Sequence, residues 1–431
     1  MKVKIWPAKG ALEGTVTAPP SKSYTHRYLA CALLAKGESR LRNPSMCTDA
    51  VASLRACKSL GATIKKRCGE LVLKSVGSLK KPRDVINCGG SGATLRFFTA
   101  ISSLAPGLVV LTGNKSLKRR PMAPLIASLR RLGVECYALG SNDTPPIVVF
   151  GGGVDGGCTS VEGDVSSQFV SALMMALVKA RRPSRMEISG ALESKGYVEM
   201  TIKVLREFGG RVEASEDFKV FEIEAPQELI PVVAEVPGDY SIAAFFAVAG
   251  AIVEGSRVRI EGLAKDDVQP EREFVSVLEE AGAKVFVGPN RLEIEGSSDL
   301  SGFKFNAKDN PDLVPPLLAL ASFCEGETVI EGCSRLRFKE SNRLESLPTE
   351  LKRVGVDVRV KGDSIVVRGR RKVEGGIVSS WMDHRVAMSL ALVGLRSEQG
   401  LVIEGFEAVS KSHPGFARDL AKLGVVVDVV G

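Results

Sequence analysis

Six short polar segments carry serine, glycine or acidic residues, and three of them add lysine or arginine, a combination suited to binding small anions. Each offers a serine or an aspartate that could cap a helix. Capping does not explain their cations, because a positive charge is unfavourable at the positive end of a helix dipole. We therefore expect a phosphate or carboxylate to offset Lys22, Arg27, Arg96 and Arg385. The segments are PPSKSYTHR (19–27), NCGGSGATLR (87–96), GDVSSQF (163–169), VPGDYS (236–241), NPDLVPP (310–316) and MDHR (382–385).

The glycine-rich stretch 89–94 is a weaker signal, because it lacks both the lysine of a Walker loop and the third glycine of a dinucleotide fingerprint. It predicts either a close approach of backbone to a small anion or a plain tight turn. Further basic segments are NKSLKRRPM (114–122), LESKGY (192–197), KDDVQPERE (265–273), RLRFKESNRLES (335–346) and VSKSHPGF (409–416). A solvated helix start with surface ion pairs is sufficient for 265–273. It does not suffice for Glu340, which lies among cations and is a candidate proton carrier.

A sixfold repeat positions these segments. Glycines that follow a helical pattern and precede a β-rich stretch recur every 69 to 76 residues, at Gly61, Gly133, Gly209, Gly282, Gly355 and Gly424. Each is predicted to end its helix in the left-handed conformation. A more apolar helix precedes each of these helices, at 24–34, 94–104, 169–178, 242–253, 313–323 and 386–395.

Each repeat is predicted to run helix, strand, helix, strand, strand. The helices are apolar enough to be buried, while the strands alternate, so we expect sheets that face solvent around a helical interior. The sixth repeat is cut short, and residues 1–20 supply strands that could complete it. Three repeats per domain place one domain at 21–228 and the other at 1–20 plus 229–431. A solenoid of six stacked repeats is the alternative.

The composition of the 431 residues is that of a globular protein, with 44% hydrophobic and 25% charged residues. The longest apolar run, 242–253, is too short to span a bilayer, and no secretory signal follows the first residues, so we expect a cytoplasmic protein. The nine cysteines never show C-x-x-C spacing and are expected to be reduced and buried. Three histidines without a paired motif make a metal site unexpected.

The net charge of +8 fits a nucleic acid, a membrane surface or a small acidic substrate equally well. Nucleic acid is disfavoured, because the basic residues are not interleaved with aromatic ones and the chain has only 2 Trp and 5 Tyr.

In order and spacing, nine segments resemble the 5-enolpyruvylshikimate-3-phosphate (EPSP) synthase family over nearly the whole chain. They are PPSKSYTHR, CGGSGATLR, KRRP, SSQF, SKGY, NPDLVP, RFKESNR, MDHR and SKSHP. The resemblance implies an α/β fold: a two-domain inside-out α/β barrel of six βαβαββ repeats, three per domain, with the active site in the interdomain cleft. It also implies transfer of the enolpyruvyl group of phosphoenolpyruvate to the 5-hydroxyl of shikimate 3-phosphate.

The resemblance assigns residues to both substrates. For shikimate 3-phosphate it implies Lys22, Ser23, Arg27, Ser166, Ser167, Gln168, Ser194, Asp312, Arg335 and Lys339. For phosphoenolpyruvate it implies Lys22, Gly92, Arg120, Gln168, Arg343, Arg385 and Lys411. Asp312 is expected to accept the proton of the 5-hydroxyl, and Glu340 with Lys22 to move the proton of the methylene carbon. A monomer without metal or cofactor is expected.

Three positions depart from the family pattern. The glycine-rich loop reads Gly90-Ser91-Gly92-Ala93, which leaves inhibitor sensitivity open, Gly196 stands where proline is common, and Arg335 stands where asparagine is common. A related family that transfers enolpyruvyl to UDP-N-acetylglucosamine is the alternative. That family carries Lys-Asn after its first strand and a reactive cysteine in the loop equivalent to 114–122, whereas this chain has Lys22-Ser23 and no cysteine there.

Overall fold

The computed structural model describes residues 1–67 and 69–430, which divide into two compact units. Unit 1 comprises Met1–Pro19 and Pro237–Gly431, and unit 2 comprises Pro20–Val236. The chain leaves unit 2 after Val236, and strand β14 (Val233–Glu235) pairs in parallel with β3 (Lys36–Arg42) of that unit.

The described residues form six four-stranded sheets, three in each unit, and every sheet has the same pairing order: one parallel pair followed by two antiparallel pairs. In unit 2 the sheets are β14 (Val233–Glu235), β3 (Lys36–Arg42), β5 (Glu70–Val76) and β4 (Thr63–Arg67); β6 (Ile86–Asn87), β7 (Gly107–Thr112), β9 (Thr144–Gly151) and β8 (Glu135–Gly140); β10 (Gly157–Glu162), β11 (Ser184–Ser189), β13 (Val220–Ile223) and β12 (Val212–Ala214).

Unit 1 repeats this arrangement, so six βαβαββ repeats make up the chain. Its sheets are β2 (Glu13–Thr17), β15 (Arg257–Glu261), β17 (Arg291–Glu295) and β16 (Lys284–Val287); β18 (Lys304–Asn306), β19 (Glu327–Glu331), β21 (Ser364–Arg368) and β20 (Asp357–Lys361); β22 (Gly376–Ser379), β23 (Leu401–Glu404), β1 (Lys2–Ile5) and β24 (Val427–Val429).

The first two strands of the chain complete sheets of unit 1. β1 lies between β23 and β24, antiparallel to both, and β2 pairs in parallel with β15. The two ends of the described chain are therefore adjacent, and the amide of Val430 donates to the carbonyl of Lys2 at 3.0 Å. Each unit is thus completed by strands that are distant in the sequence from the sheets they join: β1 and β2 in unit 1, and β14 in unit 2.

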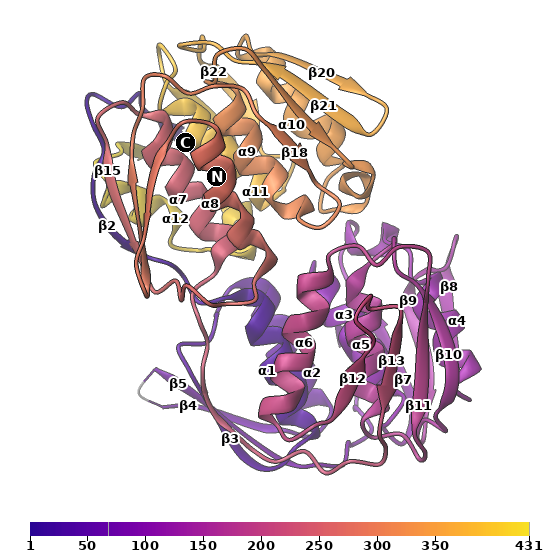
Figure 1. Ribbon diagram of the computed structural model, residues 1–431. Helices are drawn as coiled ribbons and strands as arrows, with labels where there is room; N and C mark the ends of the chain where they lie inside the picture. The colour runs from indigo at the N-terminus through magenta and orange to yellow at the C-terminus, as the bar shows by residue number, and fades with distance from the viewer. Residues whose placement is uncertain (68, 431) are drawn as a thin grey trace. The chain divides into compact units, whose positions relative to one another are not determined.

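Two helices accompany each sheet, and the first of each pair lies inside its unit (Figure 1). The helices of unit 2 are α1 (Lys22–Leu34), α2 (Thr48–Ser59), α3 (Gly92–Ser102), α4 (Ala123–Arg131), α5 (Ser167–Leu177) and α6 (Lys195–Glu207). Those of unit 1 are α7 (Tyr240–Ile252), α8 (Phe274–Glu280), α9 (Val314–Ala321), α10 (Arg343–Arg353), α11 (His384–Gly394) and α12 (Phe416–Ala421).

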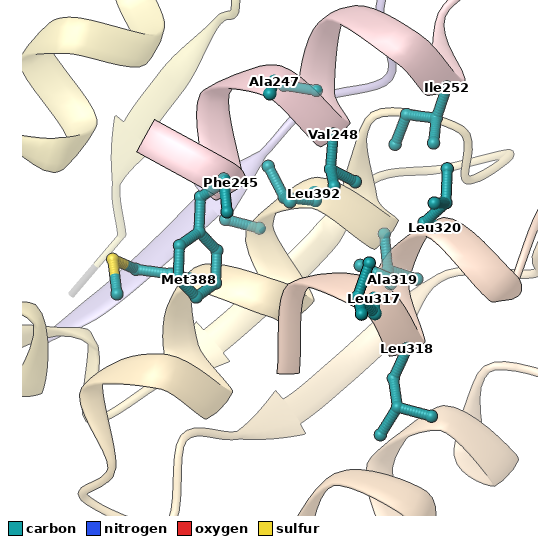
Figure 2. Packing of buried hydrophobic residues seen from close by; sticks show 14 of the residues in the cluster. Phe245, Ala247, Val248, Ile252, Leu317, Leu318, Ala319, Leu320, Met388 and Leu392 are labelled. Atoms are coloured by element: carbon teal, nitrogen blue, oxygen red, sulfur yellow. The ribbon is translucent and has the colours of Figure 1, made fainter. Parts of the chain in front are cut away.

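The interior of unit 1 consists of α7, α9 and α11, whose side chains interdigitate (Figure 2). Phe245 on α7 lies beside Met388 on α11, and Leu320 on α9 lies toward Ile252 of α7. Every residue of α7 and of α9 is buried. Helices that are apolar on all sides must be covered on all sides, and the surrounding sheets provide that cover.

All six helix-ending glycines have positive φ, between 79° and 110°. After α2, the amide of Gly61 donates to the carbonyl of Lys58 and that of Ala62 to the carbonyl of Cys57. The same two bonds recur at the other five helix ends, and they are those of the Schellman motif. Because a side chain is strained at such φ values, glycine at this point marks each helix end in the sequence.

Two expectations fail. Cys158 is exposed rather than buried, because it lies on edge strand β10 and points away from its buried neighbours Thr159 and Val161. Cys68, the remaining cysteine whose burial was expected, lies outside the described residues. Segment 265–273 is not a plain solvated helix start, since Gln269 is 3% exposed and bonds both the amide of Tyr240 and the carbonyl of Gly238, bracing the start of α7.

Across the described residues, no helix combines the length and hydropathy that a membrane span requires.

Candidate active site

The polar segments lie at the N-termini of the inner helices. Serine or aspartate caps five of these helices: Ser21, Ser91, Ser166, Asp239 and Asp383 each accept a backbone N–H of the first turn. At the sixth, α9, the short 3₁₀ helix Pro311–Leu313 precedes the α-helix and its N-cap, Asn310, makes no side-chain capping bond. Asp312 in this 3₁₀ turn is bound by cations instead.

Three cations surround the Asp312 carboxylate in unit 1. Lys339 Nζ and Arg343 Nη1 each lie 3.0 Å from Oδ1, and Arg385 Nη2 lies 3.5 Å from Oδ2. Burial alone would raise the pKa of Asp312, but Arg385, Lys339 and Arg343 together hold it well below the usual range. The carboxylate is therefore ionised at every physiological pH.

Arg343, at the first position of α10, organises the rest of this group. Its side chain is 1% exposed and donates to Asp383 from Nε at 2.8 Å and from Nη2 at 3.1 Å. Nη2 also donates to Glu340 at 2.9 Å. Asp383, which is fully buried, was not among the site residues predicted from sequence, although its segment 382–385 was singled out.

Two lysines complete the unit 1 group. Burial, only partly offset by Asp312, lowers the pKa of Lys339 to about 8. Lys411 Nζ lies 3.7 Å from Glu340 Oε1. Arg335, in the 3₁₀ helix Ser334–Phe338, donates to the carbonyl of Lys308 and lies near enough to lower the pKa of Lys339 further.

The unit 1 group holds four cations and three carboxylates, which leaves one positive charge in excess. Such a group attracts an anion. Among the described residues, Glu340, Asp383 and His384 also bring ligand atoms within 4.8 Å of one another. A metal ion there would have to displace the guanidinium of Arg343, which already bonds both carboxylates.

A second group lies in unit 2, at the start of α3 and α5. A methyl group on Gly92 would stand 2.8 Å from Arg120 Nη1 and 3.8 Å from Gln168 Oε1, so the three residues meet at one point. Gln168 Oε1 accepts from Arg96 Nη1 at 2.8 Å, and the same nitrogen lies 3.1 Å from Ser166 Oγ. Arg96 was noticed in the sequence as an unexplained cation, and the structure places it in contact with two predicted residues.

Lys22 joins this group through α2. Its Nζ lies 3.1 Å from Asp49 Oδ2, and the backbone carbonyl of Asp49 lies 3.4 Å from Thr94 Oγ1. Thr94 in turn donates to Ser91, the cap of α3. The partner of Lys22 is 27 residues away in the sequence, so the motif alone did not reveal it.

The remaining predicted residues of unit 2 are divided between helix starts and the interior. Ser167 is buried at the start of α5, and Ser194, with φ 57°, precedes α6. Arg27 is 2% exposed and bonds Thr201 Oγ1 and the Tyr197 carbonyl, both at 2.8 Å. It also donates to the carbonyl of Ser23 at 2.9 Å, so in this state it holds α1 against α6.

Two units of three βαβαββ repeats, each with a cationic group at the starts of its inner helices, define a class of α/β proteins built to hold small anions. The family model for EPSP synthase (3-phosphoshikimate 1-carboxyvinyltransferase) matches residues 7–420. The chain therefore belongs to the EPSP synthase family.

Individual relatives agree with this membership. A 3-phosphoshikimate 1-carboxyvinyltransferase of Methanocaldococcus jannaschii is 37% identical over 421 residues, 97% of either chain. That of Korarchaeum cryptofilum is 40% identical over 416 residues, 96% of this chain and 97% of the other. The structure of EPSP synthase from Acinetobacter baumannii aligns over 100% of both chains with a TM-score of 0.84 at 28% identity. An enolpyruvyl transferase of Streptomyces tendae, NikO, shares the fold with a TM-score of 0.80 at 17% identity.

Proposed function

We propose that the protein is a 3-phosphoshikimate 1-carboxyvinyltransferase, which transfers the enolpyruvyl group of phosphoenolpyruvate to the 5-hydroxyl of shikimate 3-phosphate and releases phosphate. The observation that carries the proposal is the ionised carboxylate of Asp312 bonded to Lys339 and Arg343, with Arg385 beside it. A reaction between two polyanions needs such cations, and one that deprotonates a hydroxyl needs a nearby carboxylate.

The residues expected to bind phosphoenolpyruvate are divided between the units. Arg343, Arg385 and Lys411 belong to unit 1, whereas Lys22 and Arg120 belong to unit 2. Arginine pairs with carboxylate and phosphate through two parallel hydrogen bonds, which fixes the orientation of the substrate as well as its position. We infer that both units contribute to this substrate.

The first step is an addition. The 5-hydroxyl oxygen bonds to C2 of phosphoenolpyruvate, its proton passes to Asp312, and the methylene carbon C3 takes a proton from Glu340 or Lys22. When the arginines also bind substrate anions, they stabilise the ionised carboxylate of Asp312 less. The pKa of Asp312 therefore rises toward a value at which this residue can accept a proton. The product of this step is a tetrahedral ketal phosphate.

The second step is an elimination that reverses the proton transfer at carbon. C3 returns its proton to the group that supplied it, Glu340 or Lys22, the C2–C3 double bond forms again, and the bond from C2 to the phosphate oxygen breaks. The proton held by Asp312 leaves with the phosphate. Glu340 bonds Arg343 at 2.9 Å and lies 3.7 Å from Lys411, so cations that bind substrate also orient this carboxylate. Positive charge held in place before the reaction stabilises the charge that develops on the departing phosphate.

A coupled phosphate-release assay tests the function. Phosphoenolpyruvate is supplied with either shikimate 3-phosphate or UDP-N-acetylglucosamine, and we expect phosphate only with the first acceptor. The pair Lys22-Ser23 favours this outcome over transfer to the nucleotide sugar. Release with the nucleotide sugar alone would overturn the assignment.

We further propose that the enzyme acts as a monomer, since the residues expected to bind both substrates are all present in one chain. We also propose that it acts in the cytoplasm. Sedimentation equilibrium tests the first point, and a mass near twice that of one chain would contradict it. Cell fractionation tests the second, and activity recovered outside the cytoplasmic fraction would contradict it.

A further inference from the structure

Glu350 is a buried carboxylate that the proposed mechanism does not use. It lies on α10 and is 1% exposed. Its Oε1 accepts the indole N–H of Trp381 at 2.7 Å, and its Oε2 accepts the backbone N–H of Ser379 at 3.1 Å. Arg353 Nη1 lies 3.3 Å from Oε2. A carboxylate is costly to bury unless such partners compensate it. Of these three partners, Trp381 lies in a single turn and Ser379 immediately precedes it.

That turn, residues 380–383, has an unusual backbone. Trp381 and Met382 have φ of 53° and 54°, and the amide of Asp383 donates to the carbonyl of Ser380 at 2.9 Å. Two successive positive φ values inside a hydrogen-bonded turn form the type I′ pattern, which favours asparagine and glycine. A tryptophan and a methionine remain in this conformation only where their surroundings impose it.

The turn leads directly into the unit 1 group. Asp383 is its last residue, caps α11 and accepts two hydrogen bonds from Arg343. Arg385, two residues further, reaches Asp312. Arg343 and Glu350 lie on the same helix, about two turns apart. Helix α10 therefore holds the 379–383 segment at two points, with Arg343 on Asp383 and Glu350 on Trp381.

We propose that Glu350 and Trp381 are positioning residues for phosphoenolpyruvate. The Glu350 carboxylate holds the strained turn against α10, and the turn fixes the positions of Asp383 and Arg385 relative to Arg343. The inference rests on the proposed function, because Arg343 and Arg385 are the residues expected to bind that substrate. Both residues act through the arginines, so their loss changes phosphoenolpyruvate binding more than the binding of shikimate 3-phosphate.

Replacement of the indole tests the link. Trp381→Phe keeps an aromatic ring and removes the N–H donor. Trp6→Phe is the matched control, because Trp6 is also 38% exposed, belongs to the same unit, and donates its indole N–H to the carboxylate of Asp428. We expect Trp381→Phe to raise KM for phosphoenolpyruvate roughly tenfold, since a misplacement of about 1 Å can cost ~100-fold in rate. KM for shikimate 3-phosphate and the melting temperature should remain near those of the control.

A second measurement needs no substrate. Amide hydrogen exchange over residues 380–386 is compared in the full-length wild type, Glu350→Gln and Glu350→Ala. Glutamine retains an acceptor for the indole, so exchange should be fastest in the alanine variant and intermediate in the glutamine variant.

Equal exchange in all three proteins, or the same KM for phosphoenolpyruvate in Trp381→Phe and Trp6→Phe, would overturn the inference. A wild type that is inactive with this substrate pair would count against the proposed function instead, and the exchange measurement would still decide the inference.

Discussion

At the scale of single residues, Asp312 poses a chemical question. A carboxylate held ionised by three cations is a weak base, yet the proposed addition requires it to take a proton. The conflict resolves if the substrates engage the same cations, because each arginine that turns to a substrate anion stabilises the ionised carboxylate less. The free enzyme would then keep Asp312 charged for binding, and the ternary complex would make it basic for catalysis.

Asp312→Asn keeps the shape of the side chain and removes its charge. We expect kcat to fall by about 10²- to 10⁴-fold, the usual contribution of a general base. Stability should fall as well, because three cations lose a carboxylate partner, but Arg343 keeps its bonds to Asp383 and Glu340. Phosphate release under saturating substrates measures kcat. Asp309→Asn, an exposed neighbour three positions earlier, is the control. Wild-type turnover in a folded Asp312→Asn protein would remove this residue from the mechanism.

We expect Lys339 to make the binding of shikimate 3-phosphate depend on pH. Its pKa is about 8, lowered by burial, so the side chain is cationic below pH 8 and neutral above it. As the pH rises, Lys339 loses its proton and no longer attracts the phosphate of shikimate 3-phosphate. The KM for this substrate should increase up to roughly tenfold between pH 7 and pH 9, as the protonated fraction of Lys339 falls.

The matched variant for this pH effect is Lys339→Arg, because a guanidinium remains charged over the whole range. The rise in KM between pH 7 and pH 9 should be absent from it. Steady-state kinetics with phosphoenolpyruvate held saturating separates the two substrates. An identical rise in wild type and Lys339→Arg would assign the titration to another group.

At the scale of elements, local signals in the sequence predict the repeat well. A glycine directly after an amphipathic helix commonly ends that helix in the left-handed conformation, so residue type and spacing alone predict the six helix ends. Five of the six inner helices begin two residues earlier than their apolar patterns indicate, for example at Lys22 rather than Tyr24 and at His384 rather than Val386. The sixth, α9, begins one residue later than expected, at Val314. The polar motif residues therefore occupy the first turn, which is what brings them to one end of the unit.

The partners of the charged residues could not be predicted in this way. Arg343 pairs with Asp383 across 40 residues, and Glu350 reaches Trp381 across 31. These contacts depend on which helices lie side by side, and a pattern of local periodicity contains no such information. The burial of Gln269 was missed for the same reason, since its partner is the start of a different helix, α7.

Gly92, at the first position of α3, gives a prediction that belongs to an element. Alanine at this position suits the helix, but its methyl group would stand 2.8 Å from Arg120 Nη1 and would push that guanidinium aside. We expect Gly92→Ala to fold normally and to raise KM for phosphoenolpyruvate by about tenfold, by misplacing one cation. Gly10→Ala is the control, because nothing lies within 4 Å of its added methyl group. Unchanged KM in Gly92→Ala would separate Arg120 from the substrate.

At the scale of the whole molecule, six copies of one topology allow equivalent positions to be compared. β1 occupies in its sheet the third place, which β9 occupies in the sheet β6-β7-β9-β8. Ile5 on β1 faces Leu401, and Ile147 on β9 faces Leu111, and both isoleucines are fully buried. The strand at the start of the chain is therefore as much a core strand of unit 1 as β9 is of unit 2.

Ile5→Ala and Ile147→Ala consequently form a matched pair that tests whether each unit unfolds on its own. Each substitution should destabilise its unit by about 2–5 kcal/mol through lost burial and a residual cavity. Both tryptophans, Trp6 and Trp381, lie in unit 1, so tryptophan fluorescence follows that unit, while circular dichroism follows both. Ile5→Ala should shift the fluorescence transition in denaturant, and Ile147→Ala should shift only a circular dichroism transition. Equal fluorescence shifts in the two variants would show that the units unfold as one cooperative body.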